Sequence, residues 1–267
     1  MTVTLDNVTH ARIKTAAASL QFLAIAHDVP IPEEHRAMSL VQAEAARVVR
    51  ELAPAPFPIP TDPAKVSAAV TKAAADRALV RESRAIAEEL AAEAEREAAR
   101  IMYDLRPTIL KAVADNFDTA LETLGTLLQT APLAITSETG HDRAAEHVEL
   151  LRTVDTLNAL TGARVRLAEI DGEDTRATPN LWYILDPKPE AQLADIRGVL
   201  NLAHPLDLAG WVSVHSVGAH VAGLDEAEQR AARFTNAQWH AGMATPDGGI
   251  GERTYAQALE LARQAAR

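Results

Sequence analysis

Residues 62–106 read DPAKVSAAVTKAAADRALVRESRAIAEELAAEAEREAARIMYDLR, a run with no glycine and with no proline after its second position. Asp62 suits the N-cap of a helix and Pro63 its first position, so the run predicts one helix from residue 63 to about Arg106. At about 1.5 Å per residue this helix is roughly 65 Å long, more than a compact domain of this size needs. We expect Pro107 to kink or restart the helix, which then resumes toward Leu128.

The apolar residues of this segment indicate which side of the helix is buried. They recur every 11 residues in two series, Leu79, Leu90 and Ile101 in one and Ala87, Ala98 and Ile109 in the other. An 11-residue repeat averages about 3.67 residues per turn, so the seam runs almost straight. We therefore predict an antiparallel bundle or coiled coil that also associates with further copies of the chain. The interface candidates are Leu79, Leu90, Ile101, Leu105 and Ile109.

Glycine divides the chain into two differently built halves. None occurs before Gly125, and all twelve lie between Gly125 and Gly251. Because glycine marks turns and close backbone approaches, the first half is expected to be helical and the second half to be richer in loops. The predicted fold is mainly α, a long-helix bundle followed by a smaller α+β unit. Its parts are a helical pair at 1–53, a proline-rich spacer at 54–62 (PAPFPIP), a long helical segment at 63–131 and the α+β unit at 142–267.

The α+β assignment depends on short apolar runs in the last part of the chain. A helix at 142–161 is expected to end at Gly162 as its C-cap. Three short β-branched or aromatic runs between turn residues then predict strands: Arg164–Ile170, Leu181–Leu185 and Trp211–Val217. Further helices are expected at 190–202, from a capping box formed by Asp225 and Glu228 to about Ala241, and at 252–266.

Composition excludes several classes of function. The chain has 267 residues, no cysteine and a net charge of −11. The lack of cysteine removes disulfide frameworks, thiolate metal sites and cysteine nucleophiles. The acidic balance argues against direct nucleic-acid binding and against an anionic membrane surface. No apolar stretch reaches membrane-spanning length, and the first residues do not resemble a signal peptide, so we expect the cytoplasm or a virus particle assembled there.

The best candidate for chemistry is HPLDLAGWVSVHSVGAH, residues 204–220. Histidine is the commonest metal ligand and acid/base residue, so a site built from Asp207, Trp211, His215 and His220 is one hypothesis. The spacing of His215 and His220 crosses Gly218 and has no accompanying glutamate, unlike helical zinc motifs. The alternative interpretation is a partly buried, hydrogen-bonded His215 and a loop residue at His220. No metal or other cofactor is predicted.

Two further loops carry weaker patterns. The segment EIDGEDT, residues 169–175, alternates carboxylates only in part, which favours a solvated acidic loop over a calcium site. The segment PDGGIG, residues 246–251, precedes a helix but lacks the spacing of a phosphate-binding loop. Trp182, Tyr183, Trp239 and His240 are interpreted as core or interface anchors because aromatic residues are scarce.

No catalytic motif is present, and the leading hypothesis is a non-enzymatic structural or assembly protein. In this hypothesis the long helices bind other copies of the chain, and the C-terminal unit docks another protein. In one version of this hypothesis the protein is a component of a virus particle or prophage. This version rests on the acidic, alanine-rich composition. The alternatives are an enzyme or a small-ligand or metal binder around Asp207, His215 and His220, and a helical regulatory adaptor that binds a protein through its N-terminal helices.

Overall fold

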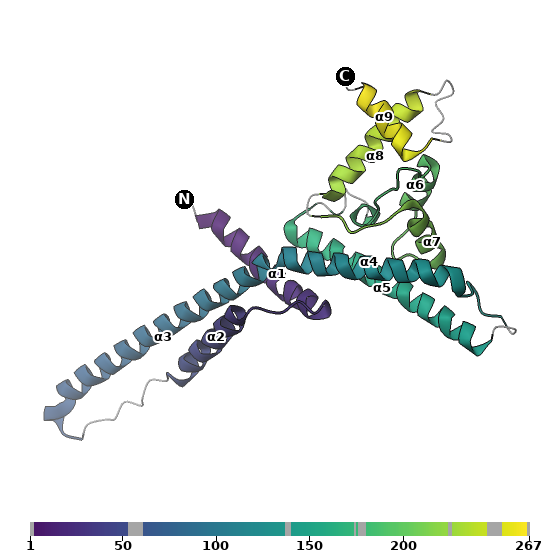
Figure 1. Cartoon of the computed structure of the whole chain (residues 1–267). Coiled ribbons are helices and arrows are strands. Elements are labelled where there is room, and N and C mark those ends of the chain that lie inside the picture. Colours follow the sequence, from purple (N-terminus) through teal and green to yellow (C-terminus); the bar gives the residue numbers. More distant parts are fainter. Residues whose placement is uncertain are drawn as a thin grey trace. The chain divides into compact units, whose positions relative to one another are not determined.

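A computed structural model (Figure 1) describes residues 3–52, 61–136, 140–173, 175, 180–223, 226–244 and 253–265. Within these residues the secondary structure is helical, and β pairing is limited to two isolated bridges, Leu185 with Ala219 and Gln192 with Thr254. The chain forms two compact units, Met1–Arg106 and Pro107–Arg267. The boundary therefore falls inside the segment 63–131 that the sequence suggested as one long helical part.

The first unit consists of three helices, α1 (Val3–Ala26), α2 (Glu33–Glu51) and α3 (Val66–Asp104). Asp62 caps the 3₁₀ turn that precedes the third, because its Oδ1 accepts a hydrogen bond of 3.0 Å from the Ala64 N–H. Pro63–Lys65 form one 3₁₀ turn, η1, before α3 begins. The helix ends at Asp104, and α4 (Arg106–Thr130) starts two residues later. The expected restart at Pro107 is thus confirmed.

Small side chains line the face of α3 that packs against the other two helices. Its buried residues are Ala87, Ala94, Ala98, Ala99 and Met102. Helix α2 runs antiparallel beside α3 and contributes buried Ala45 (Figure 1). Helix α1 contributes buried residues including Leu20 and Leu23, and its Lys14 Nζ lies 2.8 Å from Oε1 of Glu95. Alanine lets helix axes approach closely, so this unit is held by thin seams rather than by a thick core.

The second unit is also helical, which corrects the predicted α+β class. Besides α4 it contains α5 (His141–Asp171), η2 (Asn180–Tyr183), α6 (Leu193–Leu200), α7 (Leu208–Val217), α8 (Glu226–Met243) and α9 (Tyr255–Ala265). No strand occurs among its described residues. The helices expected at 190–202 and 252–266 are present with shorter bounds. The helix expected at 252–266 corresponds to α9, which begins at Tyr255 and ends at Ala265.

Two of the three predicted strands are parts of helices. Residues 164–170 belong to α5, which continues through Gly162 and ends at Asp171, followed by Gly172 as its C-cap with a φ of 83°. The predicted C-cap at Gly162 is therefore wrong, and Gly172 is the left-handed cap. Residues 211–217 belong to α7, and its buried Trp211, Val214 and Val217 are three residues apart. This spacing buries one helical face, and burial of that face overrides the β propensity of valine.

The third predicted strand does not form either, and of its residues only Leu185 takes part in an isolated bridge, with Ala219. Leu181–Tyr183 lie in η2, and the following residues run beside the chain after α7. The Asp186 N–H donates to the Gly218 carbonyl at 3.1 Å, and the His220 N–H donates to the Ile184 carbonyl at 2.7 Å. Gly218 has a φ of 121°, and a Cβ there would lie 2.5 Å from the Asp186 carbonyl oxygen. Glycine is therefore required at this close approach.

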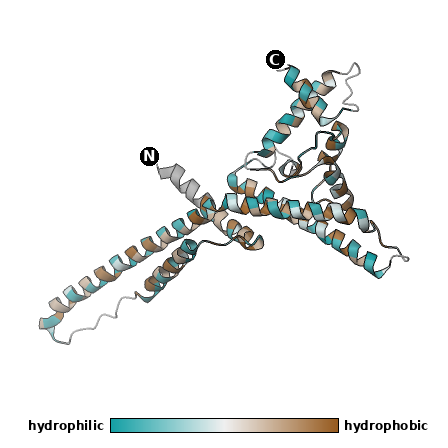
Figure 2. Ribbon diagram, in the orientation of Figure 1, coloured by the Kyte–Doolittle hydropathy of each residue, from teal (hydrophilic) through white to brown (hydrophobic). Residues whose placement is uncertain are grey.

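Several sequence predictions fall on residues that the structure does not describe. They are the spacer PAPFPIP, the loop PDGGIG, Asp174 of the acidic loop and Asp225 of the capping box. Helix α8 begins at Glu226, whose Oε2 accepts a 2.7 Å hydrogen bond from the Gly223 N–H. Among the described residues no helix is both long and apolar enough to cross a membrane. Along α3, hydrophobic and hydrophilic residues alternate from end to end (Figure 2).

Candidate functional surfaces

Helix α3 carries an exposed apolar stripe, which we call the α3 outer stripe and which consists of Leu79, Ile86 and Leu90. These side chains are 65%, 60% and 51% exposed. At about 100° per residue the three lie within an arc of about 40°, roughly a quarter-turn from buried Ala87, Ala94 and Ala98. Three large aliphatic side chains aligned on one face and open to solvent make this face of α3 a candidate interaction surface.

The α3 outer stripe contains only some of the residues that the sequence predicted for the interface. Leu79 and Leu90 are on it, whereas Ile101 and Leu105 are half-buried, and Ile109 is fully buried in the second unit. Ile86 was missed because it does not fit the 11-residue series. It lies seven residues after Leu79 and four before Leu90, which is a heptad spacing that the sequence did contain.

The residues suggested for chemistry have structural partners instead of a common centre. Trp211 is fully buried, and its Nε1–H donates to Oδ1 of Asn158 at 3.1 Å. Asp207 is the N-cap of α7, because its Oδ1 accepts from the Gly210 N–H at 2.8 Å. Both side chains are thus occupied in holding α7 in place.

The two histidines point to different turns of α4. A Cβ on Gly125 would lie 2.8 Å from Nε2 of His215, so glycine makes room for that ring. Nδ1 of His220 lies 3.0 Å from Oδ1 of Asp118. Gly125 and Asp118 are two turns apart, about 10 Å along the helix. Burial, together with the charge of Lys188, lowers the pKa of His215.

A metal site is not assembled from these side chains. Asp207 and His215 are separated by about 12 Å along α7, because each residue of a helix advances the axis by about 1.5 Å. Throughout the part of the chain that the structure describes, no three His, Asp or Glu residues are grouped so that they could hold a metal ion. Asp207, Trp211, His215 and His220 therefore lie in one region of the second unit, but their polar atoms do not meet at a common site.

Two buried arginines that the sequence analysis did not single out organise the chain after α7. Nε and Nη2 of Arg164 donate to the carbonyls of Ala222 and Gly223, both at 2.8 Å. Burial lowers the pKa of Arg164 and raises the pKa of Tyr183, over which the guanidinium lies, to about 12. These contacts satisfy backbone groups in the interior, so we assign the arginine an architectural role.

Arg230 acts in the same way from α8. Its Nη1 donates to the carbonyls of Leu185 and His220, at 3.1 and 2.7 Å, and Nη2 lies 3.0 Å from Oε1 of Glu226. No sequence signal distinguished Arg164 and Arg230, because the chain is rich in arginines on exposed helical faces.

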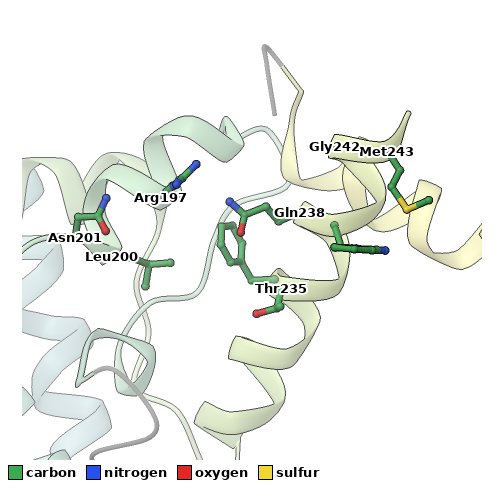
Figure 3. A pocket seen from close by; sticks show the side chains of 9 residues that line it. Arg197, Leu200, Asn201, Thr235, Gln238, Gly242 and Met243 are labelled. Atoms are coloured by element: carbon green, nitrogen blue, oxygen red, sulfur yellow. The ribbon is translucent and has the colours of Figure 1, made fainter. Parts of the chain in front are cut away.

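A groove of about 650 Å³ lies between α6 and α8 (Figure 3). Its lining is mixed: Arg197, Leu200, Asn201, Phe234, Thr235, Gln238, Trp239, Gly242 and Met243. Trp239 and Met243 are 66% and 69% exposed at its rim, whereas Phe234 is buried at its base. Tryptophan and methionine are enriched at protein interfaces, which agrees with the interpretation of Trp239 as an interface anchor.

A second groove, of about 760 Å³, lies beside the start of α7. It is lined by Leu133, Ala134, Ile135, His147, Leu151, Asp207, Leu208, Ala209 and Val212. The polar groups do not converge on it as a catalytic set, since Asp207 Oδ1 caps α7 and His147 Nδ1 lies 2.7 Å from the Pro132 carbonyl.

Comparison of the chain with protein-family models, with curated proteins and with solved structures found no match.

Proposed function

We propose that this protein is a non-enzymatic assembly protein that associates with further copies of itself through the α3 outer stripe. The observation that carries the proposal is the exposure of Leu79, Ile86 and Leu90 along one face of the longest helix. Exposing three such side chains to water costs free energy in proportion to their apolar area. A second helix that covers them removes this area from water and so stabilises the association.

Docking of another protein is the second part of the proposal, and we assign it to the groove between α6 and α8. Trp239 and Met243 at the rim offer large contact areas, and Arg197 offers a cation that can bind a carboxylate of the partner. The two surfaces belong to different units, so assembly and docking use separate parts of the chain.

We further propose a virus particle or prophage-encoded assembly as the setting. Its support is compositional: an acidic, alanine-rich and mainly helical chain suits subunit bridging. Sedimentation of the chain with assembled particles in the producing cells would support this setting, and recovery only in the unassembled fraction would contradict it.

Size-exclusion chromatography with light scattering over a range of concentrations tests self-association of the full chain. We expect a mass above the 28.6 kDa of one chain, as an integer multiple that dissociates on dilution. Leu90→Asp places a charge in the stripe and should weaken association at least tenfold, because a buried unpaired charge is costly. Leu40→Asp is the matched control, since Leu40 is 71% exposed on α2 and outside the stripe.

Two outcomes contradict the proposal. A single-chain mass at every concentration would show that the stripe does not bind another copy, and would favour the adaptor hypothesis with a different protein on α3. Equal losses in Leu90→Asp and Leu40→Asp would show that association occurs without specific use of the stripe.

A further inference from the structure

Polar positions continue the α3 outer stripe in both directions along the helix. Residues at alternating spacings of four and three continue it along the helix: Lys72, Asp76, Leu79, Ser83, Ile86, Leu90, Glu93 and Glu97. This is the heptad spacing of helices that wrap around each other. Only the four central positions are apolar or small, so the seam is short and its middle lies near residues 84 and 85.

Charge is distributed unequally on the two sides of that middle. Residues 72–84 contain four cationic side chains, Lys72, Arg77, Arg81 and Arg84, and two acidic ones, Asp76 and Glu82. Residues 85–97 contain five acidic side chains, Glu88, Glu89, Glu93, Glu95 and Glu97, and one cationic one, Arg96. The first stretch thus carries a net charge of +2 and the second a net charge of −4.

We propose that the occupant of the α3 outer stripe is α3 of a second copy, running antiparallel, with the two-fold axis between residues 84 and 85. This inference rests on the proposed self-association and specifies its geometry. In this register Leu79 faces Leu90 of the second copy, and Ser83 faces Ile86 of the second copy. Each of these layers occurs twice because a two-fold interface is self-complementary.

Charge complementarity selects this direction over the parallel one. Antiparallel pairing places the +2 stretch of each copy against the −4 stretch of the other. Lys72 then faces Glu97 of the second copy at each end of the seam, where Glu97 also binds Arg100 of its own helix. Parallel pairing places like stretches together, which is unfavourable at both ends. In this register Asp76 faces Glu93 of the second copy, and this pair forms the one like-charged layer of the seam. Arg77 follows Asp76 in the sequence.

The packing of the first unit leaves the stripe exposed. The face of α3 that α1 and α2 cover contains Ala87, Ala94 and Ala98, and the stripe lies roughly a quarter-turn away from it. The N-terminal part of α3 is exposed as well, since Val66 and Val70 are about half exposed. The stripe is therefore separate from the alanine face, and its three side chains are exposed on the side where the second copy would lie.

Engineered disulfides test the register in the full chain, which contains no cysteine of its own. Leu79→Cys and Leu90→Cys proteins are oxidised separately and as an equimolar mixture, after mixing under reducing conditions. A disulfide needs Cα atoms within about 7 Å. We expect a covalent dimer in the mixture and less than a tenth as much in either protein alone. Leu40→Cys, which lies outside the stripe, is the control for random collision.

Each pattern of products has one meaning. Covalent dimers of Leu79→Cys with itself would overturn the antiparallel register while self-association stands. A dimeric mass by light scattering with no covalent product in any sample would overturn the stripe as the interface. A single-chain mass in every sample would contradict self-association itself, and with it the proposed function.

Charge exchange gives a second measurement that does not depend on cysteine. Lys72→Glu and Glu97→Lys should each weaken the dimer roughly three- to tenfold at low salt, as expected for exposed ion pairs that are reversed at two symmetric positions. The double variant restores opposite charges across the seam and should return to within about twofold of the original protein. Additive losses in the double variant would overturn the pairing of these two positions.

Discussion

Asn158 joins three parts of the second unit, and its replacement by alanine is the sharpest test of how that unit is held together. Its Nδ2–H donates to the Leu206 carbonyl at 2.8 Å, and its Oδ1 accepts from the Leu206 N–H at 2.9 Å. The same Oδ1 accepts from Nε1–H of Trp211 at 3.1 Å. One half-buried amide on α5 thus fixes both the chain before α7 and the largest buried side chain of α7.

The expected loss follows from these three hydrogen bonds. Each contributes about 1 kcal/mol to the free energy of unfolding, and a buried donor left without a partner costs about 1–3 kcal/mol. Leu206 and Trp211 are both buried, so water does not readily replace the amide. Asn158→Ala should therefore lower the free energy of unfolding by about 3 kcal/mol. For a unit of this size the midpoint of thermal unfolding falls by roughly 6 to 12 °C.

Tryptophan fluorescence during urea or thermal unfolding reports this effect selectively, because Trp182, Trp211 and Trp239 all lie in the second unit. Asn236→Ala, on an exposed face of α8, is the matched control and should change the free energy of unfolding by less than about 0.5 kcal/mol. If Asn158→Ala were as stable as Asn236→Ala, the three hydrogen bonds would not anchor α7 and the reasoning would be refuted.

Two further predictions concern the same unit. Because burial and Lys188 lower the pKa of His215 below its ordinary value of 6.5, the unfolded chain takes up the proton first as pH falls, and stability decreases below about pH 6.5. His215→Gln should reduce the loss between pH 7.5 and 5.5, and parallel pH profiles would contradict this. Gly218→Ala should destabilise the unit by about 3 kcal/mol or more, because the new Cβ would clash with the Asp186 carbonyl oxygen and because Gly218 has a φ of 121°, which alanine rarely adopts. Gly162→Ala should stabilise it by about 0.5–1 kcal/mol, because Gly162 lies inside α5 with open space around it, and a loss would mean that it is a cap.

Local chemistry made the N-terminal part of the chain predictable. The cap at Asp62 and the break before Pro107 depend on side chains and backbone donors within a few residues. The same reasoning failed at Gly162, where glycine occurs inside a helix, because the cost of glycine there is small compared with burial of α5 on both sides of it.

The candidate surfaces were predictable only in part. The periodic spacing predicted that Leu79 and Leu90 lie on one face of the helix. It did not predict that this face is exposed, because periodicity cannot tell which of two faces of a helix is covered by neighbouring helices. Arg197 and Trp239, 42 positions apart in the sequence, line one groove between α6 and α8, which no local pattern indicates.

By itself the sequence determined the helical character of the N-terminal half, the uninterrupted length of α3 and the opposite charges of its two halves, because these depend on neighbours along the chain. Tertiary structure decided which residues of α3 are buried, since α1 and α2 cover the alanine face and leave Leu79 and Leu90 exposed. It also decided that the run 211–217 is a helix, in which Trp211 contacts Phe117 of α4 and Asn158 of α5 and shares its buried face with Val214 and Val217. Burial is a property of the whole unit, and its free energy exceeds the propensity of any single residue.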